Sequence, residues 1–216
     1  MNLAPTVFIV DDDVAYLDSI SVLVQSMGLR TKAYSSAELF LSEFDPESPG
    51  CLILDVRMPM TGGLALQESL NKLPLCPPII IMTGHAEVPI ALRAMRQGAV
   101  DFLQKTFSES ELYDAIQRAI SKDALRREEH SRSQMLAKRF SLVSPAEHDV
   151  LQLILRGDTN KKIAATLDIS QRAVEDRRAR LMQKLEIDNI AALIRLAIEA
   201  KLWKGEENRI AASSLR

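Results

Sequence analysis

An uninterrupted apolar run, Cys51–Leu54, that ends on the carboxylate of Asp55 is the feature that most constrains the fold. Four apolar residues without alternation are typical of a strand that is buried on both faces of a parallel sheet. Met58-Pro59 and Gly62-Gly63 follow at once and indicate a loop. The pattern therefore predicts a charged side chain at the carboxyl end of a central strand, where open α/β sheets bind ligands.

Polar side chains also follow three other apolar runs of the N-terminal half. Residues 7–10 precede Asp11 and Asp12, residues 79–82 precede Thr83, and residues 100–103 lie shortly before Lys105. If these runs are parallel strands, their polar groups meet at one edge of the sheet. Clustered carboxylates need a neutralising cation, and an all-oxygen site favours Mg²⁺. A carboxylate beside Mg²⁺, with Lys and Thr converging on it, can accept a phosphoryl group and stabilise its oxygens.

The first 120 residues alternate strand and helix patterns in a regular way. Spacings of the form Ser-x-x-Glu, typical of capped helix starts, occur at Ser35–Glu38, Ser108–Glu111 and Ser144–Glu147. Alternating elements of this length predict a doubly wound, five-stranded parallel sheet with helices on both faces, as in flavodoxin-like α/β domains. We therefore expect residues 1–120 to form one α/β domain.

The rest of the chain has a different pattern. Residues 121–140 are mostly charged or polar, and no Gly or Pro interrupts the segment 121–139. They predict a helical linker, although an ordinary charged linker fits the composition too. Residues 141–204 predict an all-α domain of four helices, in which a tight turn at 168–170 joins two short ones, and residues 205–216 predict a tail. An arginine-rich helix after such a turn is typical of a helix-turn-helix, the alternative being a small bundle with a solvated basic face.

Charge is divided between the two halves. Residues 1–120 carry 8 Lys and Arg against 15 Asp and Glu, a formal charge of −7, whereas residues 121–216 carry 19 against 14, which is +5. An acidic half joined to a basic half indicates two tasks and makes a polyanion a candidate partner of the second half. The excess is modest, so charge by itself does not establish nucleic-acid binding.

The first 120 residues or so resemble the receiver domain of two-component response regulators. The resemblance rests on residues that follow one another in the family's order: Asp11 and Asp12, Asp55, Thr83 and Lys105. The resemblance implies that Asp55 accepts phosphate from a histidine kinase and that Thr83 and Lys105 bind the phosphoryl oxygens. It implies that Phe102 is the switch aromatic. The implied Mg²⁺ ligands are Asp12, Asp55 and the backbone carbonyl of Arg57, with Asp11 acting partly through water. The sequence departs from the family after Lys105, where Thr106 replaces the usual cis-proline, so we expect a trans peptide there.

Residues 142–198 resemble the LuxR-type DNA-binding domain, notably at residues 160–164, Ser170, Val174 and 184–185. The resemblance implies a helix-turn-helix at about residues 160–178 and a recognition helix over 171–184. The expected DNA contacts are four cationic residues and three others: Lys161, Arg172, Arg178 and Lys184, and Glu175, Asp176 and Ala179.

Together the two resemblances indicate a transcriptional regulator of the FixJ/NarL kind rather than an enzyme. The expected cofactor is Mg²⁺, and the expected partners are a histidine kinase, double-stranded DNA, RNA polymerase and, after phosphorylation, a second copy of the chain. No apolar run is long enough to span a bilayer, so no membrane partner is expected. Cys51 and Cys76 lack metal-ligand spacing and are interpreted as buried thiols in a reducing compartment, so a cytoplasmic location is expected.

Two other classes of protein remain as alternatives. Enzymes of the haloacid dehalogenase kind also use a strand-end Asp with Mg²⁺, but they need a second Asp two residues later, where this chain has Arg57. A receiver-type adaptor whose second domain binds protein is the other alternative.

Overall fold

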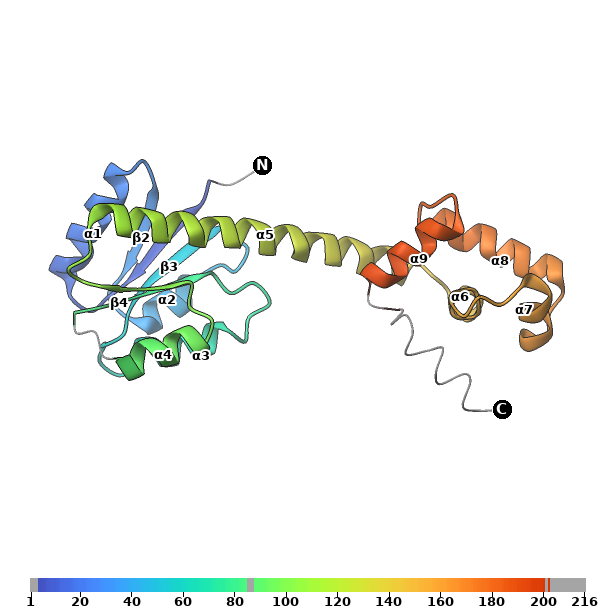
Figure 1. Ribbon diagram of the computed structural model, residues 1–216, viewed down its shortest axis with the longest axis horizontal. Coiled ribbons are helices and arrows are strands. Elements are labelled where there is room, and N and C mark those ends of the chain that lie inside the picture. Colours follow the sequence, from blue (N-terminus) through green and yellow to red (C-terminus); the bar gives the residue numbers. More distant parts are fainter. Residues whose placement is uncertain (1–3, 85–87, 201, 203–216) are drawn as a thin grey trace. The chain divides into compact units, whose positions relative to one another are not determined.

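The computed structural model describes residues 4–84, 88–200 and 202, so the tail predicted at 205–216 lies outside the described residues (Figure 1). The chain forms two compact units, residues 1–128 and 129–216, and the border between them lies inside one long helix. Among the described helices, none combines the length and apolar character that crossing a lipid bilayer requires.

The first unit is built on a five-stranded sheet. All neighbouring strands pair in parallel, in the order β2-β1-β3-β4-β5, which confirms the predicted α/β architecture. Strand β3, which the sequence predicted to be buried on both faces, is buried at every residue, and so is β4. The strands are β1 (Thr6–Val10), β2 (Arg30–Tyr34), β3 (Gly50–Asp55), β4 (Ile79–Thr83) and β5 (Asp101–Gln104).

Among the described residues, five helices cover both faces of this sheet. Figure 1 shows α1 and α5 on one face and α2, α3 and α4 on the other. Two apolar clusters fill the space between the layers, one around Phe40 and Leu66 and the other around Leu17 and Ile116. The bounds are α1 (Val14–Ser26), α2 (Ala37–Glu43), α3 (Gly63–Leu70), α4 (Val88–Arg96) and α5 (Glu109–Ser141).

Helix α5 is 33 residues long, and residues 121–140 lie within it. Asp123 on this helix is only 4% exposed, and its Oδ2 accepts hydrogen bonds from the Gly50 N–H at 2.8 Å and from Arg127 Nε at 2.7 Å. Arg127 also donates to three consecutive carbonyls of the loop before β3, at distances of 2.6–2.9 Å, those of Pro46, Glu47 and Ser48. We call this group the Asp123–Arg127 clamp; it holds the helix against the start of the central strand.

The described part of the second unit is helical. Helix α6 begins with the capping box predicted from the sequence, in which the Ser144 side chain and the Glu147 side chain each bond the other residue's backbone N–H. One apolar cluster, which includes Val150, Ile163, Val174 and Leu193, joins the four helices. Their bounds are α6 (Pro145–Leu155), α7 (Asn160–Leu167), α8 (Gln171–Lys184) and α9 (Ile190–Glu199).

Candidate functional site

The polar groups predicted at the sheet edge come together in the structure. Asp55 is the last residue of β3, Thr83 is the last of β4, and Asp11 directly follows β1; all three are at most 4% exposed. Lys105 directly follows β5, and its Nζ lies 2.6 Å from Asp11 Oδ2 and 3.1 Å from Asp55 Oδ1. Two buried carboxylates from different strands therefore converge on one ammonium.

Backbone contacts fix the position of Asp55. Its Oδ2 accepts a hydrogen bond from the Arg57 N–H at 2.6 Å, which closes the turn after the strand. Gly63, the first residue of α3, comes so close that an added Cβ would lie 2.0 Å from the Asp55 carbonyl oxygen. Only glycine fits at this position. From the Gly62-Gly63 pair the sequence predicted a loop, but not this steric requirement.

Burial and neighbouring charges shift the titration of these groups. Burial raises the pKa of Asp55, and Asp11 adds to the rise, while Lys105 and the Arg57 N–H oppose it. For Lys105, burial acts to lower the pKa, but its hydrogen bonds to Asp11 and Asp55 outweigh burial and leave the pKa raised. Lys105 is therefore a permanent cation beside a carboxylate that is poorly solvated.

Lys105 reaches both carboxylates although no proline follows it. No peptide bond between described residues is cis, so the Lys105–Thr106 peptide is trans, as expected from the sequence. Its backbone N–H donates to the Thr83 carbonyl at 2.8 Å, which ties the loop after β5 to the end of β4.

Sequence reasoning missed Tyr16 at this site. Its ring lies beneath the Lys105 ammonium, with Nζ 4.2 Å from the ring centroid, and its hydroxyl donates to Met82 Sδ at 2.8 Å. Burial raises the pKa of Tyr16 to about 12, so the hydroxyl stays protonated at neutral pH. A tyrosine at helical spacing beside other apolar residues gives no sequence signal of such a contact.

The acidic groups fit a hard cation. Asp11 and Asp55 already share one positive charge, and their donors are all oxygens, as Mg²⁺ prefers. Asp12 is exposed next to Asp11, and within the described ranges no three His, Cys, Asp or Glu side chains form a preformed metal cluster. The ligand set Asp11, Asp12, Asp55 and the Arg57 carbonyl stays a prediction.

The predicted switch residues lie on neighbouring strands. Phe102 on β5 pairs with Ile81 on β4 and is half-buried against the cluster that includes Ile81. Because side chains alternate along a strand, Thr83 lies on the same face of the sheet as Ile81. The two switch candidates therefore share one face, next to α4.

Helices α7 and α8 form a helix-turn-helix. Asp168 ends α7 in a left-handed conformation with φ of 52°, and Ser170 caps α8 through a bond from the Ala173 N–H at 3.1 Å. The bounds of α8 are those predicted for the recognition helix. Val174 and Leu181 are its buried residues, which leaves the charged positions around the rest of the helix.

The predicted DNA contacts divide into two groups. Arg178 and Lys184 are half-buried and already paired: Arg178 Nη1 donates to Asn160 Oδ1 at 2.6 Å, and Lys184 Nζ donates to Glu147 Oε2 at 2.7 Å. The remaining predicted contacts are exposed, namely Lys161, Arg172, Glu175, Asp176 and Ala179. Their roles stay predictions.

The fold and the sheet-edge site, joined to a helix-turn-helix, define a two-domain regulatory protein. Residues 7–117 match the family described as the response regulator receiver domain, and residues 141–197 match the bacterial regulatory proteins of the luxR family. The chain belongs to the response regulators that join a receiver domain to a LuxR-type DNA-binding domain, a family of transcriptional regulators and not of conventional enzymes. The haloacid dehalogenase alternative is thereby excluded.

Similar proteins cover nearly the whole chain. Response regulator protein TodT of Pseudomonas putida is 40% identical over 198 residues, which are 92% of this chain and 87% of TodT. Transcriptional regulatory protein FixJ of Bradyrhizobium diazoefficiens is 37% identical over 194 residues, 90% of this chain and 95% of FixJ. The structure of response regulator StyR matches with a TM-score of 0.82 at 39% identity, covering 91% of this chain and 99% of that chain.

Proposed function

We propose that the protein is a transcriptional regulator that is controlled by phosphorylation of Asp55. The observation that carries this proposal is the convergence of Asp11, Asp55 and Lys105 at the carboxyl edge of the sheet, with Lys105 Nζ within 3.1 Å of both carboxylates. A carboxylate held beside a fixed cation is suited to attack phosphorus, because the new acyl phosphate carries negative charge that needs a partner.

The proposed chemistry moves a phosphoryl group from a histidine kinase to Asp55. A carboxylate oxygen of Asp55 forms the new bond to phosphorus while the bond from phosphorus to the kinase imidazole breaks. Lys105 and the Thr83 hydroxyl bind the phosphoryl oxygens. Asp11, Asp12, Asp55 and the Arg57 carbonyl would hold Mg²⁺, which supplies charge neutralisation when bound. Phosphorylation from acetyl phosphate and slow self-dephosphorylation by water follow from the same arrangement.

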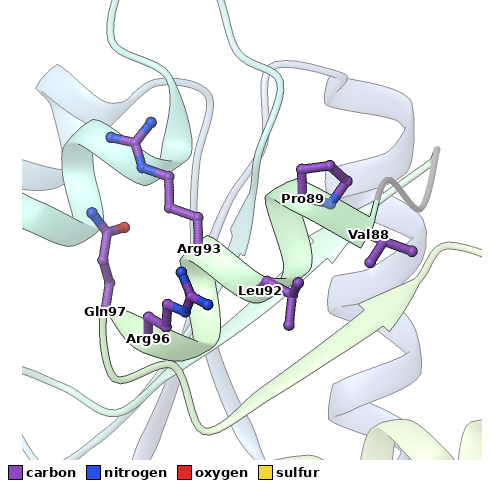
Figure 2. Close-up of a pocket in the computed structure, with 6 residues that line it drawn as sticks. All are labelled: Val88, Pro89, Leu92, Arg93, Arg96 and Gln97. Atoms are coloured by element: carbon purple, nitrogen blue, oxygen red, sulfur yellow. The ribbon is translucent and has the colours of Figure 1, made fainter.

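Phosphorylation then promotes dimerisation through the face formed by α4 and β5. Thr83 bonds the new phosphoryl oxygen, and its movement leaves room for Phe102 to follow and repack this face. An open groove of about 590 Å³ lies along helix α4 and is lined by Arg93 and Arg96 among others. Figure 2 shows Val88 and Leu92, which also line this groove, projecting from one side of the helix. Val88 is 70% exposed and Leu92 is 52% exposed, so a second copy of the chain would bury apolar surface here.

The second unit binds double-stranded DNA with α8 as its recognition helix. The exposed cations Lys161 and Arg172 contact phosphates, while the exposed Glu175, Asp176 and Ala179 face the bases or the backbone. In this proposal the regulator works in the cytoplasm and contacts RNA polymerase at its target promoters.

Labelling with acetyl phosphate and Mg²⁺ tests the proposal. Asp55→Asn should abolish the label, and Asp12→Ala should weaken it, whereas Asp18→Asn, at an exposed position of α1, should label like the wild type. Selection of DNA from a random pool, with and without acetyl phosphate, tests the second half. A label that persists in Asp55→Asn, or a selection that enriches no sequence, would refute the proposal.

A further inference from the structure

Tyr16 contacts the Lys105 ammonium through the face of its ring. Two hydrogen bonds hold Tyr16 in place. The Tyr16 N–H donates to Asp13 Oδ1 at 3.1 Å at the start of α1, and the hydroxyl donates to Met82 Sδ at 2.8 Å. Met82 is 1% exposed and lies next to Thr83 in β4. The ring therefore spans from the helix after β1 to the strand that ends at Thr83.

The Lys105 side chain needs such support. It is long and flexible, and its side chain is 22% exposed. Its ammonium has two carboxylate partners, Asp11 at 2.6 Å and Asp55 at 3.1 Å, and one of them is the group whose charge and size change in the proposed reaction. The ring of Tyr16, 4.2 Å from Nζ, stays the same throughout.

We propose that Tyr16 is a positioning residue, which holds the Lys105 ammonium beside Asp55 through a cation–π contact during phosphoryl transfer. This inference rests on the proposed role of Asp55 as phosphoacceptor. The face of an aromatic ring attracts an ammonium through the ring quadrupole. This contact uses no oxygen acceptor, so a phosphoryl group that hydrogen-bonds to Lys105 does not have to displace it. Lys105 can therefore exchange an Asp55 oxygen for a phosphoryl oxygen while remaining in place.

The neutral state of the phenol is part of the arrangement. Because burial raises its pKa to about 12, Tyr16 keeps the proton that it donates to Met82, and its ring does not become a phenolate competing as an anion for Lys105. The neighbouring ionisable groups that face it are Lys105, Asp11 and Asp55.

Two substitutions of the full-length chain separate the ring from the hydroxyl. Tyr16→Phe keeps the ring face and loses the bond to Met82, whereas Tyr16→Leu removes the ring and keeps a buried apolar side chain. With acetyl phosphate and Mg²⁺, Tyr16→Leu should lower the rate constant for Asp55 labelling by about threefold to tenfold, the factor that a partly buried cation–π contact supplies. Tyr16→Phe should label within about twofold of the wild type.

A fluorination series separates positioning from simple packing. Phenylalanine at position 16 is replaced by its mono-, di- and trifluoro analogues, which keep the shape of the ring but withdraw charge from its face. We expect the labelling rate to fall step by step along the series while the thermal unfolding midpoint changes little. A flat series, or Tyr16→Leu labelling at the wild-type rate, would overturn the positioning role alone. A wild-type chain that takes no label at Asp55 would instead overturn the proposed function, and this inference with it.

Discussion

The Glu147 carboxylate, 4% exposed at the start of α6, accepts a hydrogen bond from the Lys184 ammonium at the end of α8, with Nζ 2.7 Å from Oε2. The Ser144 N–H donates to the same oxygen at 2.8 Å. Burial acts to raise the pKa of Glu147, but Lys184 and Ser144 outweigh it and lower the pKa to about 2. The pair therefore joins α6 and α8 through a carboxylate that is ionised at neutral pH.

This pair predicts a loss of stability in acid. Because the pKa of Glu147 is lower in the folded chain, the unfolded chain binds more protons between about pH 4.5 and 2, and stability rises with pH through that window. The contribution is complete above about pH 4.5 and is lost as pH falls to about 2. Amide hydrogen exchange of α6 and α8, followed by NMR across this range, should show protection rising with pH. In the double variant Glu147→Gln/Lys184→Met this pH dependence should disappear.

At neutral pH, Lys184→Met should destabilise the second unit by about 1–3 kcal/mol, because it leaves a buried carboxylate without its partner. The double variant should recover part of this loss. If Lys184→Met instead leaves hydrogen exchange unchanged and weakens binding to every DNA sequence, the ammonium acts at the DNA backbone and not in the fold.

Adjacent glycines after Asp55 should respond very differently to the same substitution. An alanine Cβ at position 63 would lie 2.0 Å from the Asp55 carbonyl oxygen, whereas at position 62 its nearest neighbour, the Val56 carbonyl oxygen, is 3.6 Å away. Gly63→Ala should therefore destabilise the first unit by about 3 kcal/mol and slow acetyl phosphate labelling, since α3 or Asp55 must move. Gly62→Ala is the matched control and should do neither. Equal effects at both positions in thermal unfolding would contradict the close approach.

Removing the charge of Asp55 should stabilise the fold in the absence of Mg²⁺. Burial raises the pKa of Asp55, so the folded chain opposes its ionisation, and stability is lost as pH rises through the titration of this group. At pH 7 Asp55→Asn should unfold at a higher temperature than the wild type, and Asp18→Asn should not. Added Mg²⁺ should raise the midpoint of the wild type more than that of Asp55→Asn, because binding to the folded state stabilises it. A lower midpoint for Asp55→Asn would contradict the direction of this pKa shift.

On the recognition helix, two exposed residues should have opposite effects on DNA binding. Glu175 can accept a hydrogen bond from the amino group of cytosine, so Glu175→Ala should relax preference at one base pair per half-site and leave nonspecific binding equal or tighter. Arg172→Ala should weaken binding to all sequences and reduce the slope of affinity against salt by about one unit. Selection from random DNA and titrations at several salt concentrations measure the two effects. An unchanged selected site for Glu175→Ala would mean that this glutamate is only solvated.

Much of the receiver half follows from local pattern. Runs such as Cys51–Leu54 predict buried strands, and polar residues that follow parallel strands must meet at one edge, so the meeting of Asp11, Asp55 and Lys105 could be foreseen. Capping boxes were predicted where the structure has them at Ser108 and Ser144. The box at Ser35 was wrong by one residue, because Ser36 caps α2 through the Leu39 N–H.

What the sequence did not predict depends on contacts between distant segments. Tyr16 donates a hydrogen bond to Met82, which lies 66 positions away in the sequence, and no local pattern predicts this contact. The charged stretch after residue 120 predicted only a linker, yet Asp123 is almost fully buried because the Gly50 N–H at the start of β3 and the Arg127 side chain supply its hydrogen bonds. Charge composition describes an average environment, whereas burial of one carboxylate is decided by a partner more than 70 residues away.

The Asp123–Arg127 clamp also bears on where the chain can be divided in the laboratory. Four backbone groups of residues 46–50 depend on two side chains that lie after the stretch matching the receiver family. A receiver cut at residue 117 would leave these groups to water, so we expect an expressed fragment to need the chain through Glu128. A chimaera that grafts another output domain onto this receiver should be spliced beyond that point, in the same helical phase. The receiver segment that can be transferred to another protein thus extends past residue 117, where the match to the receiver family ends.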